Sequence, residues 1–136
     1  MTPRKKLRAI MAGKKLVLMP GAYDALSARV IEKEGFEAIV AGGYAGVGSM
    51  LAQADMGQSN MRDYAGHYGR ICDAVEIPVY VDADTGFGGV NNVRQMVRIL
   101  VMCHLKYMLA WLQQQRIMQV MICCRFADII IIELRL

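Results

Sequence analysis

The chain has 136 residues, of which 55% are hydrophobic and 21% are charged, so it can bury a core and is not expected to be disordered. Its length is typical of a single domain. The net charge is +4, and part of the excess lies in residues 4–8, without the interleaved aromatic residues that are typical of nucleic-acid binding. We therefore expect no nucleic-acid partner.

Signals for export and membrane insertion are absent from the sequence pattern. The first 15 residues lack an apolar stretch followed by small residues, which argues against a secretory signal. The charge-free apolar run from Ile99 to Leu105 is far shorter than the ~20 residues that span a bilayer. The four cysteines, Cys72, Cys103, Cys123 and Cys124, show no CxxC spacing. We expect reduced thiols, a cytoplasmic protein and no membrane partner.

The predicted elements begin with a helix. Thr2 and Pro3 are typical of a helix start, and this helix is expected to run to about Met11. Residues 16–19 form a short apolar run that ends at Pro20, which predicts a buried strand.

A second helix and a second strand follow. Asp24 is the expected N-cap of a helix through about Glu34, and Gly35 is expected to end it. Its predicted buried face carries four apolar residues, Ala25, Leu26, Val30 and Ile31. Residues 38–41 predict the next strand, which leads into the glycine-rich segment 42–48.

The same alternation continues up to residue 100. Residues 61–75 predict a helix, residues 79–81 predict a strand after Pro78, and residues 91–100 predict a further helix. Apolar strands that are each followed by a helix indicate a parallel sheet covered on both faces. A complete (β/α)8 barrel needs about 250 residues, so three strand–helix units cannot close one alone.

The C-terminal part differs in composition, because residues 90–136 contain neither glycine nor proline. Residues 99–126 favour a helix, and the β-branched run at 128–133 predicts a buried strand. The fold expected from the pattern is an α/β protein with an apolar, largely helical tail.

Two segments follow predicted strands at the position where parallel α/β folds carry their functional groups. The first is residues 42–49, whose glycines expose backbone N–H groups that can hold a carboxylate or phosphate. No Gly-Lys-Ser/Thr follows and no GxGxxG is present, and a plain turn is the alternative interpretation.

The second segment places Asp82 and Asp84 two residues apart at the end of a strand, before a glycine turn. On an extended chain, residues i and i+2 face the same side, so both carboxylates are expected to point toward one hard cation. Oxygen ligands suit Mg²⁺ or Mn²⁺. A solvated loop in which Asp84 caps the turn is the alternative.

Three further polar residues have less specific sequence patterns. Asp55 lies between the two segments, where it either orients metal-bound water or acts as a turn residue. His67 and His104 have no partner pattern and are expected to be structural.

Beyond these patterns, the sequence resembles the isocitrate lyase/phosphoenolpyruvate mutase superfamily. The resemblance rests on residues 18–28 (LMPGAYDALSA), the Gly43-Tyr44 pair, Asp55, and residues 81–88 (VDADTGFG), and it covers about residues 3–100. Within the superfamily, the sequence resembles short-chain members such as methylisocitrate lyase, dimethylmalate lyase and oxaloacetate decarboxylase-like proteins. The resemblance implies the first three units of a (β/α)8 barrel at residues 1–100, followed by a divergent tail at 101–136.

The resemblance also implies a function and its site. Members of the superfamily are usually tetramers that use Mg²⁺ to hold a small 2-oxo or 2-hydroxy carboxylate while a C–C bond breaks. By resemblance, Asp82 would ligate the metal directly, Asp84 would do so through water, and Asp55 would hydrogen-bond metal-bound water. Gly42, Gly43 and Tyr44 would contact the substrate carboxylate.

Several features depart from the family pattern. Gly42 stands where relatives often have Ser or Thr, and Ala54 stands where they have Pro. The Glu-Asp-Gln strand and the Lys-x-Cys-Gly-His loop, which carries the acid–base group, are absent. The expected function is therefore a Mg²⁺-dependent C–C lyase, truncated or frameshifted after about residue 100. The alternatives are an inactive fragment, a regulatory subunit, an oxaloacetate decarboxylase or a phosphonate-forming mutase.

Overall fold

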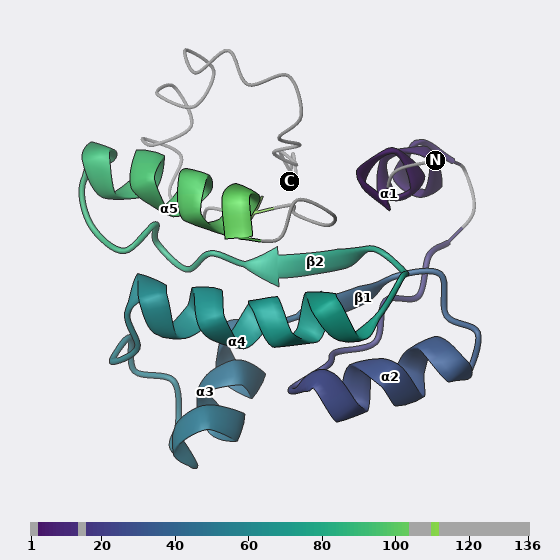
Figure 1. The fold of residues 1–136 in the computed structure, drawn as a ribbon, viewed down its shortest axis with the longest axis horizontal. Coiled ribbons are helices and arrows are strands. Elements are labelled where there is room, and N and C mark those ends of the chain that lie inside the picture. The colour runs from purple at the N-terminus through teal and green to yellow at the C-terminus, as the bar shows by residue number, and fades with distance from the viewer. Residues whose placement is uncertain (1–2, 14–15, 104–109, 112–136) are drawn as a thin grey trace.

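The computed structural model describes residues 3–13, 16–103 and 110–111. Over these residues the chain forms helices that alternate with short strands, as Figure 1 shows. In chain order the elements are α1 (Pro3–Ala12), α2 (Ala25–Lys33), β1 (Ile39–Ala41), α3 (Gly43–Leu51), α4 (Met61–Ala74), β2 (Val79–Asp82), α5 (Val90–Cys103) and β3 (Ala110–Trp111). The predicted helices at 2–11, 24–34, 61–75 and 91–100 are confirmed, as are the strands at 38–41 and 79–81.

The sheet is parallel, with the strand order β1-β2-β3. Ile39 lies opposite Val79, and Asp82 at the end of β2 lies opposite Trp111. The carboxyl ends of the strands therefore lie at the same edge of the sheet. From this edge the chain continues into the N-terminal ends of α3 and α5 (Figure 1). The α/β class with a parallel sheet is confirmed.

The predicted strand at residues 16–19 is wrong. The backbone meets β1 only at Pro20–Ala22, where Val40 N–H donates to the Pro20 carbonyl at 2.9 Å and Ala22 N–H donates to the Val40 carbonyl at 2.7 Å. Leu16 and Leu18 are 82% and 66% exposed. Apolar residues alone did not make a strand here, because sheet pairing starts only where the chain reaches Val40.

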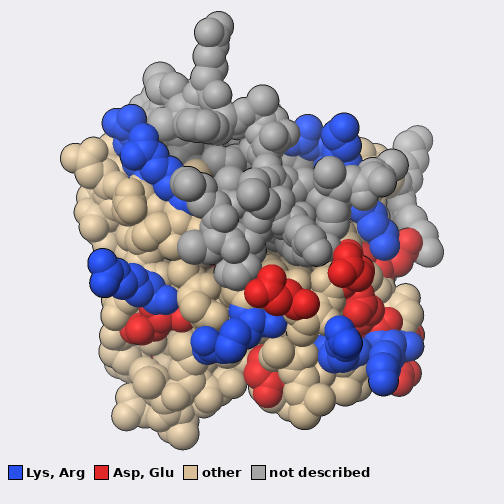
Figure 2. Space-filling model, viewed as in Figure 1, with Lys and Arg blue, Asp and Glu red and all other residues tan. Residues whose placement is uncertain are grey.

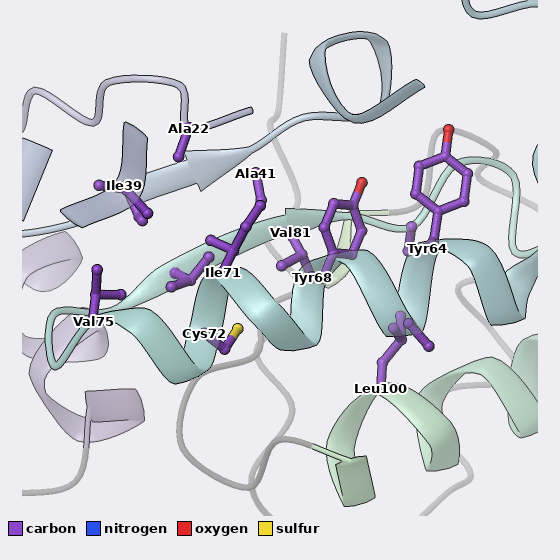
Figure 3. Close-up of a cluster of buried hydrophobic side chains, with 14 of the residues drawn as sticks. Ala22, Ile39, Ala41, Tyr64, Tyr68, Ile71, Cys72, Val75, Val81 and Leu100 are labelled. Atoms are coloured by element: carbon purple, nitrogen blue, oxygen red, sulfur yellow. The ribbon is translucent and has the colours of Figure 1, made fainter. Parts of the chain in front are cut away.

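The two longer strands are covered unequally on their two faces. In β2, Val79 and Val81 are fully buried, whereas Tyr80 between them is only partly buried. The buried side chains pack against Ile71 and Tyr68 of α4 (Figure 3). Tyr80 packs with Leu7 of α1 and Met19 on the other face, so both faces are covered as predicted, although this face is less buried.

The ends of α2 follow from its sequence, but its buried face does not. Asp24 accepts a hydrogen bond from Ser27 N–H at 2.7 Å in a capping box, and Gly35 ends the helix region with φ +86°. Leu26 and Val30, predicted to be buried, are 72% and 51% exposed. The small Ala28 is buried instead, together with the partly buried Ile31. Two predicted positions of this face are thus wrong.

The tail is described only in part. Residues 110–111 pair with β2 as a strand, so the helix predicted across 99–126 is wrong at that point, although α5 continues to Cys103. His104, Cys123, Cys124 and the strand predicted at 128–133 lie outside the described residues. The domain boundary at residue 100 stays a prediction.

Two surface properties bear on partners. Among the described residues no helix is long and apolar enough to cross a bilayer. On the face seen in Figure 2, basic and acidic side chains of the described part are interspersed, and neither sign gathers into a large field.

Candidate metal and carboxylate site

The glycine-rich segment after β1 is a helix. Sequence reasoning treated residues 42–48 as a loop or turn, but α3 begins at Gly43, and Gly42 is its N-cap with φ −84° and ψ 150°. Gly42 and Gly43 have no positive φ, so the glycines here do not serve a tight turn. Only Gly43 is closely packed, because a Cβ there would lie 3.0 Å from Oδ2 of Asp82, whereas a Cβ on Gly46 would make an ordinary contact with His67 at 3.5 Å.

Asp82 lies at the carboxyl end of β2 and is oriented by two backbone groups. Gly43 N–H, at the start of α3, donates to Oδ2 of Asp82 at 3.3 Å. Asp84 N–H donates to Oδ1 of the same carboxylate at 2.8 Å. The strand end and the helix start thus hold this carboxylate in one orientation.

Asp84 lies in a turn rather than on an extended chain. Its φ is +48°, and the turn is closed by Gly86 N–H donating to the Ala83 carbonyl at 3.0 Å. The expectation that Asp82 and Asp84 face the same side of an extended chain is therefore wrong. Asp84 lines a groove of about 780 Å³, which is also lined by residues 57–62 and Asn92.

Asp55 reaches the same place from the segment between α3 and α4. Its Oδ1 accepts a hydrogen bond from Gly57 N–H at 3.0 Å, as expected of a turn residue. Its Oδ2 lies 3.1 Å from the position that a Cβ on Gly43 would take, and Oδ2 of Asp82 lies 3.0 Å from that position. Two carboxylates thus converge where Gly43 has no side chain.

Tyr64 of α4 was missed by sequence reasoning and belongs to this cluster. Its hydroxyl donates to Oδ2 of Asp55 at 3.4 Å. Burial raises the pKa of Tyr64 well above its ordinary value, and the neighbouring carboxylates, first Asp55, raise it further. Its position on an aromatic helix face was the available signal, but that pattern is equally typical of a core residue.

The remaining predicted contacts lie at the start of α3. A Cβ on Gly42 would meet nothing within 4 Å, so this side of the site is open. The Tyr44 side chain is 71% exposed, which leaves its backbone N–H as its contribution at the helix N-terminus.

The donors suit a hard cation in kind, because they are all carboxylate oxygens. No group of three or more His, Cys, Asp or Glu side chains in the described part of the chain is gathered tightly enough to hold a metal directly. A cation that keeps most of its water shell fits this arrangement, since Mg²⁺ is commonly held through one or two carboxylates.

Comparisons with known proteins identify the family of the chain. The family described as phosphoenolpyruvate phosphomutase matches residues 7–105. The chain is 41% identical over 98 residues to 2,3-dimethylmalate lyase of Eubacterium barkeri, covering 72% of this chain and 34% of that protein. It is 42% identical over 85 residues to a probable 2-methylisocitrate lyase 2 of Corynebacterium glutamicum, covering 62% and 27%.

A solved structure extends the comparison to three dimensions. The crystal structure of a phosphonopyruvate hydrolase complex with oxalate and Mg²⁺ has a TM-score of 0.72 and 27% sequence identity, covering 82% of this chain and 39% of that one. The chain spans about a third of the length of the curated relatives it matches, 34% and 27%. Because the family match extends over well more than half of the sequence, the chain belongs to the isocitrate lyase/phosphoenolpyruvate mutase superfamily.

Proposed function

We propose that this protein supplies the Mg²⁺-binding and carboxylate-binding part of a lyase that breaks a C–C bond in a small 2-hydroxy or 2-oxo di- or tricarboxylate. The observation that carries the proposal is the convergence of Asp82, Asp55 and the N-terminal end of α3 at Gly43. The names of the two curated relatives support the reaction class. The oxalate and Mg²⁺ of the hydrolase structure support the ligand chemistry.

In this proposal Asp82 holds the cation directly, and Asp84 and Asp55 hold its water shell. The bound cation would stabilise the negative charge that develops on an enolate when the C–C bond breaks. Asp82 suits this role because two backbone N–H groups already fix its orientation. Mn²⁺ is expected to replace Mg²⁺, since both prefer oxygen ligands.

The N-terminal end of α3 would bind the substrate carboxylate. The N–H groups of the first helical turn have no partners within the helix and favour an anion. Gly43 N–H donates to Asp82 in this structure, so a substrate carboxylate would share this donor with Asp82. The N–H of Tyr44 is the second donor, and the absence of a side chain at Gly42 leaves room for the ligand.

We also propose that β1 and β2 belong to a (β/α)8 barrel of which this chain forms the first part. The parallel order and the helices after each strand support this architecture. The Lys-x-Cys-Gly-His loop is missing from the sequence, so we expect this chain by itself to show little or no turnover.

The first test measures Mn²⁺ binding to the 136-residue chain by electron paramagnetic resonance, with and without oxalate. We expect Asp82→Ala to weaken Mn²⁺ binding at least ~10-fold, because it removes the direct ligand. The matched control is Glu37→Ala, which removes an exposed acid at the opposite, amino end of β1 and should bind Mn²⁺ normally. Unchanged binding by Asp82→Ala would refute the metal site.

The second test addresses the reaction. The chain is incubated with Mg²⁺ and 2-methylisocitrate, 2,3-dimethylmalate, oxaloacetate or phosphonopyruvate, and products are followed by NMR. Release of a 2-oxo acid from either of the first two supports the lyase, whereas turnover of oxaloacetate or phosphonopyruvate alone indicates the decarboxylase or mutase alternative.

A further inference from the structure

Tyr64 is held rigidly between the core and the site. It lies on α4 and is 2% exposed. Its ring centroid lies 5.4 Å from that of Tyr68 on the same helix and 5.4 Å from that of Phe87. In Figure 3, Tyr64 and Tyr68 rise from α4 with their hydroxyls pointing the same way. The contact with Phe87 connects α4 to the turn that carries Asp84.

The hydroxyl of Tyr64 ends at the convergence of the two carboxylates. It lies 3.4 Å from Oδ2 of Asp55 and 3.3 Å from the position that a Cβ on Gly43 would take. The other oxygen of Asp55 accepts from Gly57 N–H at 3.0 Å, within its own turn. The Tyr64 hydroxyl is thus the link between Asp55 and the packed part of the molecule.

We propose that Tyr64 is a positioning residue, which holds Oδ2 of Asp55 at the Asp82 side of the site and thereby orders the water shell of the bound cation. The inference rests on the proposed function, because it assumes that a cation binds at Asp82. Asp55 lies on an exposed segment between two helices, and without this bond its carboxylate is restrained only by its own turn. Groups that orient metal ligands typically contribute about 10- to 100-fold to metal affinity.

The structure offers a matched control one helical turn away. Tyr68 is equally buried, at 2% exposed, and its hydroxyl has no hydrogen-bond partner within the described residues. Tyr64→Phe and Tyr68→Phe therefore remove the same atom from the same helix face, but only the first removes a bond to Asp55. Both variants keep the aromatic ring and its packing.

The experiment measures the dissociation constant of Mn²⁺ for both variants, together with the thermal midpoint without metal. We expect Tyr64→Phe to weaken Mn²⁺ binding about 10-fold, the lower end of the range for groups that orient metal ligands because the bond to Asp55 is long at 3.4 Å, and Tyr68→Phe to leave it unchanged. A loss of affinity of the same size in both variants would show that the core, and not the bond to Asp55, is responsible, and would overturn the proposal.

A double-mutant cycle separates positioning from general structural effects. In an Asp55→Ala background, Tyr64→Phe should have no further effect on Mn²⁺ binding, since its partner is gone. Independent, multiplicative effects of the two changes would contradict the proposal. If Asp82→Ala abolishes binding while Tyr64→Phe binds normally, the metal site stands and only the role of Tyr64 fails. If Asp82→Ala binds normally, the proposed function itself fails.

Discussion

At the scale of single residues, Gly43 is a position where the site leaves little room for a side chain. Its backbone N–H contacts Asp82, and the space beside its Cα is enclosed by Asp82, Asp55 and Tyr64. A methyl group there would lie 3.0 Å from one carboxylate oxygen and 3.1 Å from the other. The glycine is therefore required by close approach and not by backbone conformation.

This geometry predicts the behaviour of Gly43→Ala. We expect its Mn²⁺ affinity to fall at least ~10-fold, because the new methyl group pushes the two carboxylates apart. Gly48→Ala on the same helix is the control, since its Cβ would meet nothing within 4 Å. This control should bind Mn²⁺ normally and gain up to about 1 kcal/mol of stability from helix propensity. Equal Mn²⁺ binding by both variants would show that the carboxylates do not meet at Gly43.

At the scale of elements, α2 is tied to the connection between α4 and β2 by two side chains. Arg29 donates from Nη1 to the Ala74 carbonyl at 2.6 Å. Oε1 of Glu32 accepts from the N–H groups of Glu76 and Ile77, at 2.7 Å and 3.1 Å. These bonds satisfy backbone groups at the end of α4 and fix the chain as it enters β2.

Glu32→Ala removes both acceptor contacts at once. We expect it to lower the free energy of unfolding by about 1–2 kcal/mol, as for hydrogen bonds to a charged group that is partly accessible to water. Urea denaturation monitored by circular dichroism measures the change. Glu34→Ala, at an exposed neighbouring position, should change stability much less. A similar loss of stability in both variants would show that the effect comes from removing a negative charge and not from the two hydrogen bonds of Glu32.

At the scale of the whole molecule, His67 is the titratable group at the junction of three helices. It lies on α4, is 4% exposed, and packs beneath Gly46 of α3. Burial lowers its pKa below the ordinary 6.5, and Arg70 acts in the same direction. A hydrogen bond to the backbone of Tyr23 and the charge of Asp24 oppose this shift.

The shift makes stability depend on pH in a defined window. Because the folded protein holds a proton on His67 less readily than the unfolded chain, stability is complete above about pH 6.5 and falls as the pH decreases below it. We expect His67→Gln to flatten the decline of the thermal midpoint between pH 7 and pH 5. If the thermal midpoint of His67→Gln declines with pH as steeply as before, other groups cause the decline. Asp24, whose pKa is lowered by the Ser27 N–H bond, acts separately, below its ordinary 3.8.

The sequence by itself determined the order of helices and strands over residues 20–100, except for α3, which was expected to be a loop or turn. The pairing of Asp24 with Ser27 and the glycine at 35 set the ends of α2, and short apolar runs set β1 and β2, because these signals are local. It also identified Asp82, Asp84 and Asp55 as candidate ligands, since carboxylates at the ends of parallel strands are rarely part of a core. The resemblance to the superfamily followed from residues 18–28, the Gly43-Tyr44 pair, Asp55 and residues 81–88.

Only the tertiary structure decided what lies next to what. Leu16 and Leu18 are exposed because the chain pairs with β1 only from Pro20 onward, which no local pattern encodes. The glycine-rich segment after β1 is a helix in which only Gly43 is closely packed, and sequence alone does not separate this arrangement from a turn. The contact of Tyr64 with Asp55 depends on how α4 packs against the sheet, so it became visible only in the folded chain.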